Sequence, residues 1–409
     1  MMAGIRAAEL CQDVTLVEKN PILGKKLLLS GKGRCNLTNA CDLDSFIKRF
    51  SRNGQFLRDA FNKFFNLDLI RFFAQRDLKL KTERQLRVFP QTNRSDSVVE
   101  VLKKELYKNK VKIIYRAIIK DIFTQPLRAG AGFMQENKIK GLLLGDGKII
   151  PADRLILATG GVSYSFTGSN GEGLELARKL GHRIVPLRPG LVPLETRQHY
   201  PKLLEGLALK NIRLRFSDSK RQIDSGIGEL LFTSFGISGP LVLSLSGQIV
   251  DWLQNSNTIY VEIDLKPALN KEQLRTRLLR EFKLNPKKAI KNTLKALLPK
   301  RLVDVFIDIA KILPDKKVSQ ITQKERESLV SLFKAMRLDI TKSRPVDEAM
   351  ITRGGISLKD INPRTMESRL IKGLYFAGEL IDIDADTGGF NLQAAFSTGY
   401  LAGESAALN

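Results

Sequence analysis

A chain of 409 residues is too long for one compact core, so we expect two or three domains. The hydrophobic content of 43% indicates a folded protein, and no apolar run reaches the roughly 18 residues of a membrane span. The formal net charge of +24 is compatible with nucleic acid, membrane surfaces or anionic substrates, and equally with lysines spread over solvated faces.

Cysteine and histidine are scarce. The three cysteines, Cys11, Cys35 and Cys41, form no C-x-x-C pair, and residues 1–10 lack the pattern of a signal peptide. A reducing cytoplasm is therefore the expected location. With only two histidines in the chain, we expect no transition-metal site.

The chain opens with an expected helix over residues 1–10 and an expected buried strand over residues 14–18, which ends in Glu18. Strand–helix–strand units that bind dinucleotides place an acid there, on the ribose hydroxyls. The strand and G-x-G-x-x-G turn that precede such a helix are not in this sequence, so we expect a parallel sheet without its first strand. Either the reading frame was assigned too late, which we favour, or the phosphate loop has been lost.

A glycine-rich loop follows at residues 30–36, Ser-Gly-Lys-Gly-Arg-Cys-Asn. A simple turn would account for its glycines alone. However, Arg34, Asn36 and Thr38 add several hydrogen-bond donors at short spacing, which suit phosphate oxygens or the edge of a flavin. Residues 84–90 are expected to form a packing loop. The alternative is that Arg87 contacts the cofactor or the substrate.

The region between this loop and residue 189 has both helical and strand patterns. We expect helices at 44–52, 54–65, 68–76, 97–107 and 173–180, and strands at 111–115, 117–123, 140–144, 148–151 and 154–159. The Gly145-Asp146-Gly147 sequence predicts a hairpin turn. The strand at 154–159 runs into Gly160 and Gly161, where backbone can approach a cofactor at a sheet edge.

From about residue 190 the pattern changes to short alternating strands, followed by helices expected at 272–282, 287–298 and 322–336. Residues 271–301 hold eleven Lys and Arg against Glu272 and Glu281. Aromatic residues are nearly absent there, so the segment offers no stacking platform for single strands. Nucleic-acid binding is therefore an alternative that we do not favour.

Near the C-terminus, a short strand at 373–377 precedes Gly378 and Glu379, and a helix over 391–407 begins after Gly388 and Gly389. Glycines let a flat ligand lie against the backbone, and the helix start favours an anion such as the edge of a reduced flavin. Glu379 and Asp382 could bind ribityl hydroxyls or simply cap a turn. Asn391 and Gln393 could reach the pyrimidine edge of the ring, although Gln393 could instead face solvent.

Several of these motifs, in this order, resemble the BaiN-like (YhiN-like) NAD(P)/FAD-dependent oxidoreductases. The matching segments are residues 25–26, 30–31, 33–39, 87–90, 158–161, 228–240, 354–356 and 373–391. The resemblance spans nearly the whole chain; Lys32 and the absent phosphate fingerprint depart from it. It implies an α/β fold in which a Rossmann-like FAD-binding domain (1–189 and 346–409) is interrupted by a β-barrel-like insert (190–345) with basic helices at about 268–336.

The resemblance also implies hydride transfer from NADH or NADPH through FAD to a small organic acceptor of enone or ketone type. No catalytic residue is identified; Tyr164 and His182 are candidates to protonate product. An RNA substrate and a truncated, flavin-free relative are the alternatives, and the oligomeric state is not indicated. The residues expected to bind cofactor are Glu18, Lys26, Gly33, Arg34, Asn36, Thr38, Ile119, Thr159, Gly160, Gly161, Gly378, Glu379, Asp382, Gly388, Gly389 and Asn391.

Overall fold

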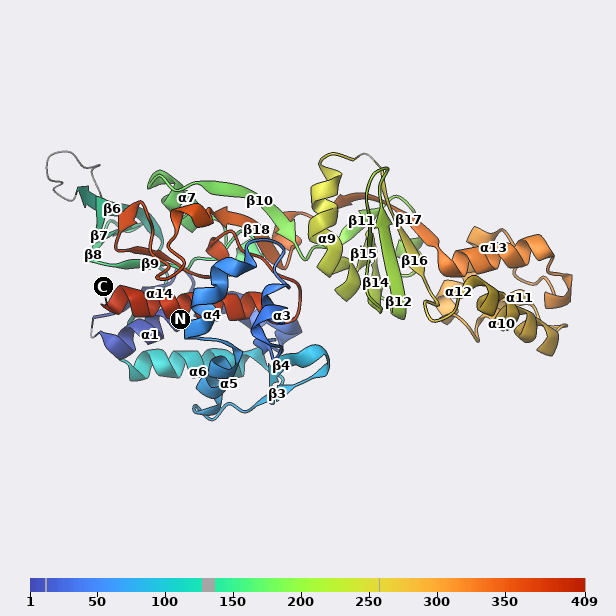
Figure 1. The fold of residues 1–409 in the computed structure, drawn as a ribbon, viewed down its shortest axis with the longest axis horizontal. Coiled ribbons are helices and arrows are strands. Elements are labelled where there is room, and N and C mark those ends of the chain that lie inside the picture. The colour runs from blue at the N-terminus through green and yellow to red at the C-terminus, as the bar shows by residue number, and fades with distance from the viewer. Residues whose placement is uncertain (12, 127–136, 257, 409) are drawn as a thin grey trace. The chain divides into compact units, whose positions relative to one another are not determined.

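The computed structural model describes residues 1–11, 13–126, 137–256 and 258–408 (Figure 1). The chain forms two compact units. Unit 1 combines Met1–Gly190 with Val346–Asn409, and unit 2 is Leu191–Pro345. Each unit is described by itself below.

Unit 1 contains both helices and short strands. Its helices are α1 (Met2–Leu10), α2 (Lys25–Leu29), α3 (Leu43–Ile47), α4 (Arg58–Lys63), α5 (Asn66–Ala74), α6 (Ser95–Lys108), α7 (Glu172–Lys179) and α14 (Phe390–Leu408). Its strands are β1 (Thr15–Val17), β2 (Thr38–Asn39), β3 (Leu80–Thr82), β4 (Arg87–Pro90), β5 (Lys112–Ile114), β6 (Ile119–Pro126), β7 (Asn137–Leu144), β8 (Ile149–Pro151), β9 (Leu155–Leu157), β10 (Ile184–Gly190), β18 (Ile351–Ile356), β19 (Ile371–Lys372) and β20 (Leu374–Phe376).

Besides β19, which pairs in parallel with β7, the parallel strands of unit 1 form two separate pairs. β1 pairs with β5, and β9 pairs with β20. Within the described residues, no hydrogen-bonded strand joins the two pairs. β20 is buried along its whole length, whereas β1 is only half-buried, so the expectation of a buried strand at 14–18 is wrong.

Three antiparallel groups complete unit 1. β6, β7 and β8 form the expected meander, and Gly147 N donates to Leu144 O at 3.0 Å in the expected turn. β2, β4 and β3 form a small sheet, so the expected packing loop at residues 84–90 is instead a short 3-10 turn (Arg84–Leu86) and a strand. β10 pairs with β18.

Unit 2 has a sheet and a group of helices. Its strands are β11 (Leu194–Thr196), β12 (Ala208–Ser217), β13 (Gln222–Asp224), β14 (Gly228–Thr233), β15 (Gly236–Ser238), β16 (Ile259–Asp264) and β17 (Met336–Ser343). Its helices are α8 (Tyr200–Leu203), α9 (Pro240–Leu253), α10 (Lys271–Leu284), α11 (Ile290–Leu294), α12 (Lys300–Ala310) and α13 (Gln323–Lys334).

The sheet of unit 2 closes on itself. Its strands follow the order β12-β14-β15-β11-β17-β16, and β12 also pairs with β16, so every member of this ring has a hydrogen-bonded neighbour on both sides. Side chains of β16 alternate between buried and half-buried positions, as a sheet with one face on a core requires. The helix expected at 287–298 was predicted with the wrong bounds, because the helix that forms there, α11, is shorter.

Candidate cofactor site

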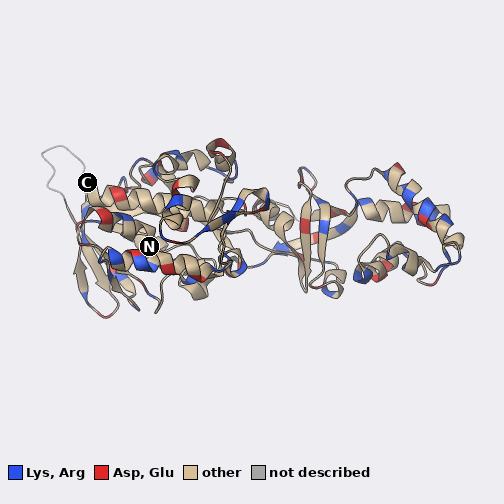
Figure 2. Ribbon diagram, turned by 90° about the horizontal axis from the view of Figure 1, so that it is seen from below, with Lys and Arg blue, Asp and Glu red and all other residues tan. Residues whose placement is uncertain are grey.

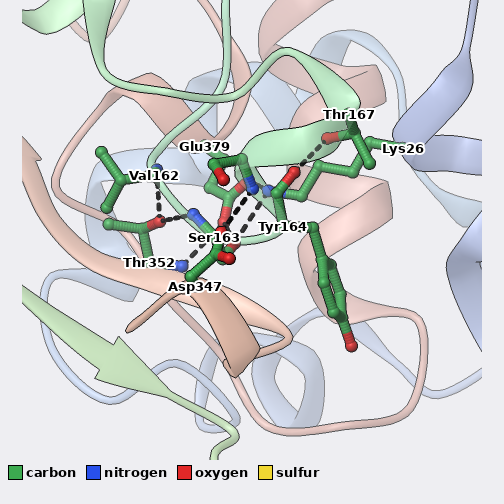
Figure 3. Close-up of polar contacts among 9 residues, drawn as sticks. Lys26, Val162, Ser163, Tyr164, Thr167, Asp347, Thr352 and Glu379 are labelled. Carbon is green, nitrogen blue, oxygen red and sulfur yellow. Dashed lines mark hydrogen bonds and ion pairs between the residues drawn. The ribbon is translucent and has the colours of Figure 1, made fainter. Parts of the chain in front are cut away.

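Glu379 is the centre of a polar cluster in unit 1. It lies in a short 3-10 turn (Gly378–Leu380) directly after β20. Its Oε2 is 2.5 Å from Lys26 Nζ, and its Oε1 accepts hydrogen bonds from Ser163 Oγ at 3.1 Å and from Thr352 N at 2.7 Å (Figure 3). Lys26 Nζ also donates to Ser163 Oγ at 2.8 Å. The side chains of Lys26 and Glu379 are only 26% and 20% exposed, so solvent screens this ion pair less than a surface pair.

The glycine pair after β9 packs directly against this cluster. Val162 N and Ser163 N donate to Thr352 Oγ1 at 2.8 and 3.1 Å. A Cβ on Gly161 would stand 2.3 Å from the same oxygen, so the close approach requires glycine there. A Cβ on Gly160 would lie 3.9 Å from Glu379 Oε2, which places this glycine beside the ion pair. Thr159, one residue earlier, is exposed.

The residues after the glycine pair are held by hydrogen bonds to residue 347. Ser165 N donates to Asp347 Oδ1 at 2.6 Å, and Tyr164 N donates to Asp347 O at 3.0 Å. The Tyr164 ring points away from the Glu379 carboxylate (Figure 3). Partial burial raises the pKa of the Tyr164 hydroxyl, because burial disfavours the phenolate.

His182, the other candidate proton donor, lies in the core of unit 1. It is 2% exposed, its Nε2 is 2.7 Å from Ser368 Oγ, and its Nδ1 is 3.1 Å from Ala177 O. Burial lowers the pKa of its imidazole. Both ring nitrogens have neighbours and the side chain has almost no exposed surface, which argues against His182 as the candidate that protonates product.

The start of α14 lies against the strand after the glycine-rich loop. Gly389 has φ +98°, and a Cβ there would stand 2.5 Å from the backbone of Thr38. Asn39 Nδ2 donates to Gly388 O at 3.3 Å, which ties the same two segments together. The loop at 30–39 and the Gly388-Gly389 pair therefore meet, although about 350 residues separate them in sequence.

The two amides at the start of α14 have structural partners. Asn391 Oδ1 accepts from Ala385 N at 2.9 Å and its Nδ2 donates to Ala385 O at 2.8 Å, so this side chain braces the preceding loop. Gln393 is 0% exposed and its Nε2 donates to Ser397 Oγ at 3.0 Å, so a solvent-facing Gln393 is wrong.

Within the glycine-rich loop, Arg34 is braced by neighbours. Its Nη2 donates to Glu83 Oε1 at 2.5 Å and to Asn93 Oδ1 at 2.6 Å. Asn36 Oδ1 is buried and has no hydrogen-bond partner, which is costly unless a ligand donates to it. Burial raises the pKa of Cys35 to about 12, so this cysteine stays a thiol and a redox role for it is not supported.

The remaining expected residues lie on other parts of unit 1. Glu18 Oε1 accepts from Asn20 N and Nδ2, both at 2.8 Å, and Asn20 Nδ2 also donates to Thr167 O at 2.9 Å. The end of β1 is thereby joined to the segment after Gly161. Ile119 begins β6 and is half-buried. Burial and the charge of Asp384 raise the pKa of the Asp382 carboxyl.

Sequence reasoning missed two members of the cluster, Ser163 and Thr352. Ser163 lies two residues after the Gly160-Gly161 pair, and Thr352 lies two residues before the Gly354-Gly355 pair. A polar residue close to each of two glycine pairs is the signal that could have identified them. The contact between them joins β18 to the segment after β9, and local sequence does not reveal such a contact.

The residues of unit 1 fit a dinucleotide cofactor. Gly160 lies beside the Lys26–Glu379 ion pair, the buried Asn36 Oδ1 needs a donor, and the start of α14 favours negative charge. Lys26, Glu379 and Glu18 would supply charges for phosphate and hydroxyl groups. The described residues contain no cluster of His, Cys, Asp and Glu suited to a metal ion. Nor is any described helix both long and apolar enough to cross a membrane.

A family model described as "HI0933-like protein Rossmann domain" matches residues 1–405. A "3-dehydro-bile acid delta(4,6)-reductase" of Clostridium scindens is 32% identical over 411 residues, which cover 100% of this chain and 96% of that protein. A "Ribosomal RNA dihydrouridine synthase" of Haemophilus influenzae is 30% identical over 400 residues, covering 98% of this chain and 94% of that protein.

Solved structures with a similar fold include a steroid dehydrogenase. A 3-ketosteroid delta1-dehydrogenase from Sterolibacterium denitrificans, in complex with 1,4-androstadiene-3,17-dione, superposes with a TM-score of 0.54 at 12% identity. The match covers 99% of this chain and 97% of that one. At this identity the likeness concerns the fold.

Proposed function

The chain belongs to the HI0933-like family of Rossmann-domain proteins, and from that premise we propose that it is an FAD-dependent reductase of conjugated carbon–carbon double bonds. It is an oxidoreductase. We propose NADH or NADPH as the electron donor and a small enone as the acceptor, in a reducing cytoplasm. The closed ring of strands in unit 2 supports assigning that unit as the barrel insert of a flavoprotein.

The observation that carries this proposal is the convergence of glycine backbone and charge around Glu379. FAD, when bound, supplies the two-electron transfer between donor and acceptor. Around it, Lys26 and Ser163 would hold the Glu379 carboxylate in one orientation, so that its oxygens accept from ribityl hydroxyls. The start of α14 after Gly389 would favour negative charge on the ring edge, and a well-placed donor of this kind contributes on the order of 2.7–4 kcal/mol.

The acceptor class is supported by the names of similar proteins. The Clostridium scindens relative is a reductase of a dehydro-bile acid, which is a small molecule with double bonds in a ring system. A reductase of this kind needs no metal and no covalent nucleophile from the protein. The chemistry needs hydride delivery to one carbon and a proton for the next, and Tyr164 is the titratable candidate that remains for the proton.

The direct test is anaerobic reduction of the FAD-loaded protein. We expect NADH or NADPH to bleach the flavin absorbance, and a steroidal enone to restore it without oxygen. Bleaching without reoxidation by any enone would refute the acceptor class. A protein that stays colourless after addition of FAD would refute the proposal as a whole.

A second substrate class is favoured by two further observations. The Haemophilus influenzae relative is a ribosomal RNA dihydrouridine synthase, and this chain carries a net charge of +24. The C5–C6 double bond of uracil is conjugated to a carbonyl, so its reduction is the same chemistry on a different scaffold. Mass spectrometry of uridine-containing RNA after incubation with the reduced enzyme would detect the gain of two hydrogens; an unchanged mass would exclude this class.

A further inference from the structure

We infer that a cluster of four lysines in unit 2 binds the phosphate backbone of folded RNA; this rests on the second substrate class proposed above. We call this cluster the lysine corner, and it consists of Lys283, Lys287, Lys288 and Lys317. All four side chains are exposed. Figure 2 shows that basic and acidic residues are interspersed along the helices of unit 2, so composition alone does not define a surface. The lysine corner is defined instead by the backbone segments that bring its lysines close together.

Two segments that are distant in sequence run side by side at the corner. Val318 N donates to Lys288 O at 2.9 Å, and Ser319 N donates to Pro286 O at 3.1 Å. An isolated antiparallel bridge joins Ala289 to Lys317. Lys287 and Lys288 therefore lie beside Lys317, and Lys283 comes one residue before α10 ends at Leu284.

The charge of the corner is not compensated by neighbouring acids. The acids nearest in sequence are engaged elsewhere: Asp315 pairs with Lys291 at 2.7 Å, Glu325 with Lys316 at 2.7 Å, and Glu281 with Arg277 at 3.6 Å. Within the described part of the chain, none of the four corner lysines forms an ion pair. When four exposed, uncompensated ammonium groups neutralise phosphates, counterions condensed on the polyphosphate are released, and this release drives binding.

The chemistry of the corner selects a phosphate backbone rather than bases. Phe282 is the aromatic residue in the basic segment, and it is only 8% exposed, so no ring is available to stack on an unpaired base. Flexible ammonium groups bind phosphates as point charges and read no sequence. The partner that fits is therefore a folded RNA, whose closely spaced phosphates are presented by helical segments.

The test uses the FAD-loaded full-length protein and a fluorescein-labelled RNA hairpin, with anisotropy measured over a series of salt concentrations. The corner variant carries Lys283→Gln, Lys287→Gln, Lys288→Gln and Lys317→Gln. The matched control removes four exposed lysines of unit 1 that form no ion pair, through Lys104→Gln, Lys108→Gln, Lys140→Gln and Lys148→Gln. Trp252, the single tryptophan, lies in unit 2 and reports by fluorescence whether the corner variant is folded.

We expect the corner variant to bind the hairpin at least about tenfold more weakly, and the slope of log Kd against log salt to fall by about 3 to 4. The control should change the slope by less than about 1. Equal losses in both variants, or binding by the wild type to anionic phosphatidylglycerol vesicles but not to RNA, would overturn the inference. Flavin bleaching by NADH or NADPH is measured on the same samples. Wild-type RNA binding without uracil reduction would leave the corner standing and refute the RNA substrate alone.

Discussion

At the scale of single residues, the ion pair between Lys26 and Glu379 sets the geometry of the site. Both carboxylate oxygens have donors: Lys26 on one, and Ser163 and Thr352 on the other. A carboxylate fixed from two sides presents its remaining lone pairs in one direction. This is why we propose that Glu379 binds the cofactor rather than caps a turn.

The pair can be tested with a double-mutant cycle on FAD affinity. We expect Lys26→Met and Glu379→Gln each to weaken FAD binding about tenfold, which is about 1.4 kcal/mol, because either change leaves a partly buried group without its partner. The double variant should lose less than the sum, with a coupling energy of about 1–2 kcal/mol. Fluorescence titration with FAD measures all four constants. Strictly additive losses would show that the two side chains act on FAD independently.

Asp382 gives a pH-dependent prediction. Burial is the main cause that raises the pKa of the Asp382 carboxyl in the folded state, and the charge of the nearby Asp384 is the second. The folded protein therefore keeps this proton at pH values at which the unfolded chain has lost it. The stabilisation by the protonated Asp382 carboxyl is present below the pKa that this group has in the unfolded chain. It is lost as the pH rises through the pKa of the folded state. Asp382→Asn should therefore raise the free energy of unfolding at neutral pH.

The advantage of Asp382→Asn should shrink as the pH falls into the acidic range. The backbone N–H of Gly354 donates a hydrogen bond to the Asp382 carboxyl, and in the variant the side-chain oxygen of Asn can accept it. Urea titrations of both proteins at neutral and at acidic pH measure the difference. An advantage that is constant with pH would show that charge at this position is not its source.

At the scale of elements, α1 and α14 pack through glycine. A Cβ on Gly403 would stand 2.4 Å from Ala3 O, whereas the nearest atom to a Cβ on Gly399 is Ala3 N at 3.5 Å. We expect Gly403→Ala to force α1 away from α14 and to destabilise unit 1 by about 1–3 kcal/mol. Gly399→Ala is the matched control, because it adds a methyl group in ordinary contact with the same helix.

We expect the Gly399→Ala protein to be unchanged or slightly more stable, by up to about 1 kcal/mol, since alanine favours helix over glycine. Circular dichroism during urea unfolding gives both values. If the two variants lost equal stability, close packing at Gly403 would not be the cause.

The elements that sequence could predict are those defined by local pattern. The terminal helix, the meander and its Gly145–Gly147 turn follow from periodicity and turn chemistry, and the structure has all of them. The helix expected at 287–298 shortens to α11, because residues 286–289 pair with residues 317–319 instead. α12 was not predicted, since its apolar run with Val303, Val305 and Ile307 is equally compatible with a strand.

At the scale of the whole molecule, the two glycine pairs were the sequence features that singled out positions of the expected cofactor site. Gly160-Gly161 and Gly388-Gly389 were expected to let a cofactor approach the backbone, and in the structure the close neighbours of Gly161 and Gly389 are protein atoms of Thr352 and Thr38. Which segments come together was beyond local sequence. Thr352 beneath Gly161, and Thr38 beneath Gly389, come from parts of the chain about 190 and 350 residues away.

We propose that one FAD molecule contacts both glycine pairs, with Glu379 between its phosphate and ring ends. A crystal structure of the protein with FAD tests it directly. We predict electron density for a single FAD within van der Waals distance of Gly160 and of Gly389, with a ribityl hydroxyl on the Glu379 carboxylate. Density for FAD elsewhere, or a Glu379 carboxylate that contacts only Lys26, Ser163 and Thr352 while FAD is bound, would contradict this placement of the cofactor.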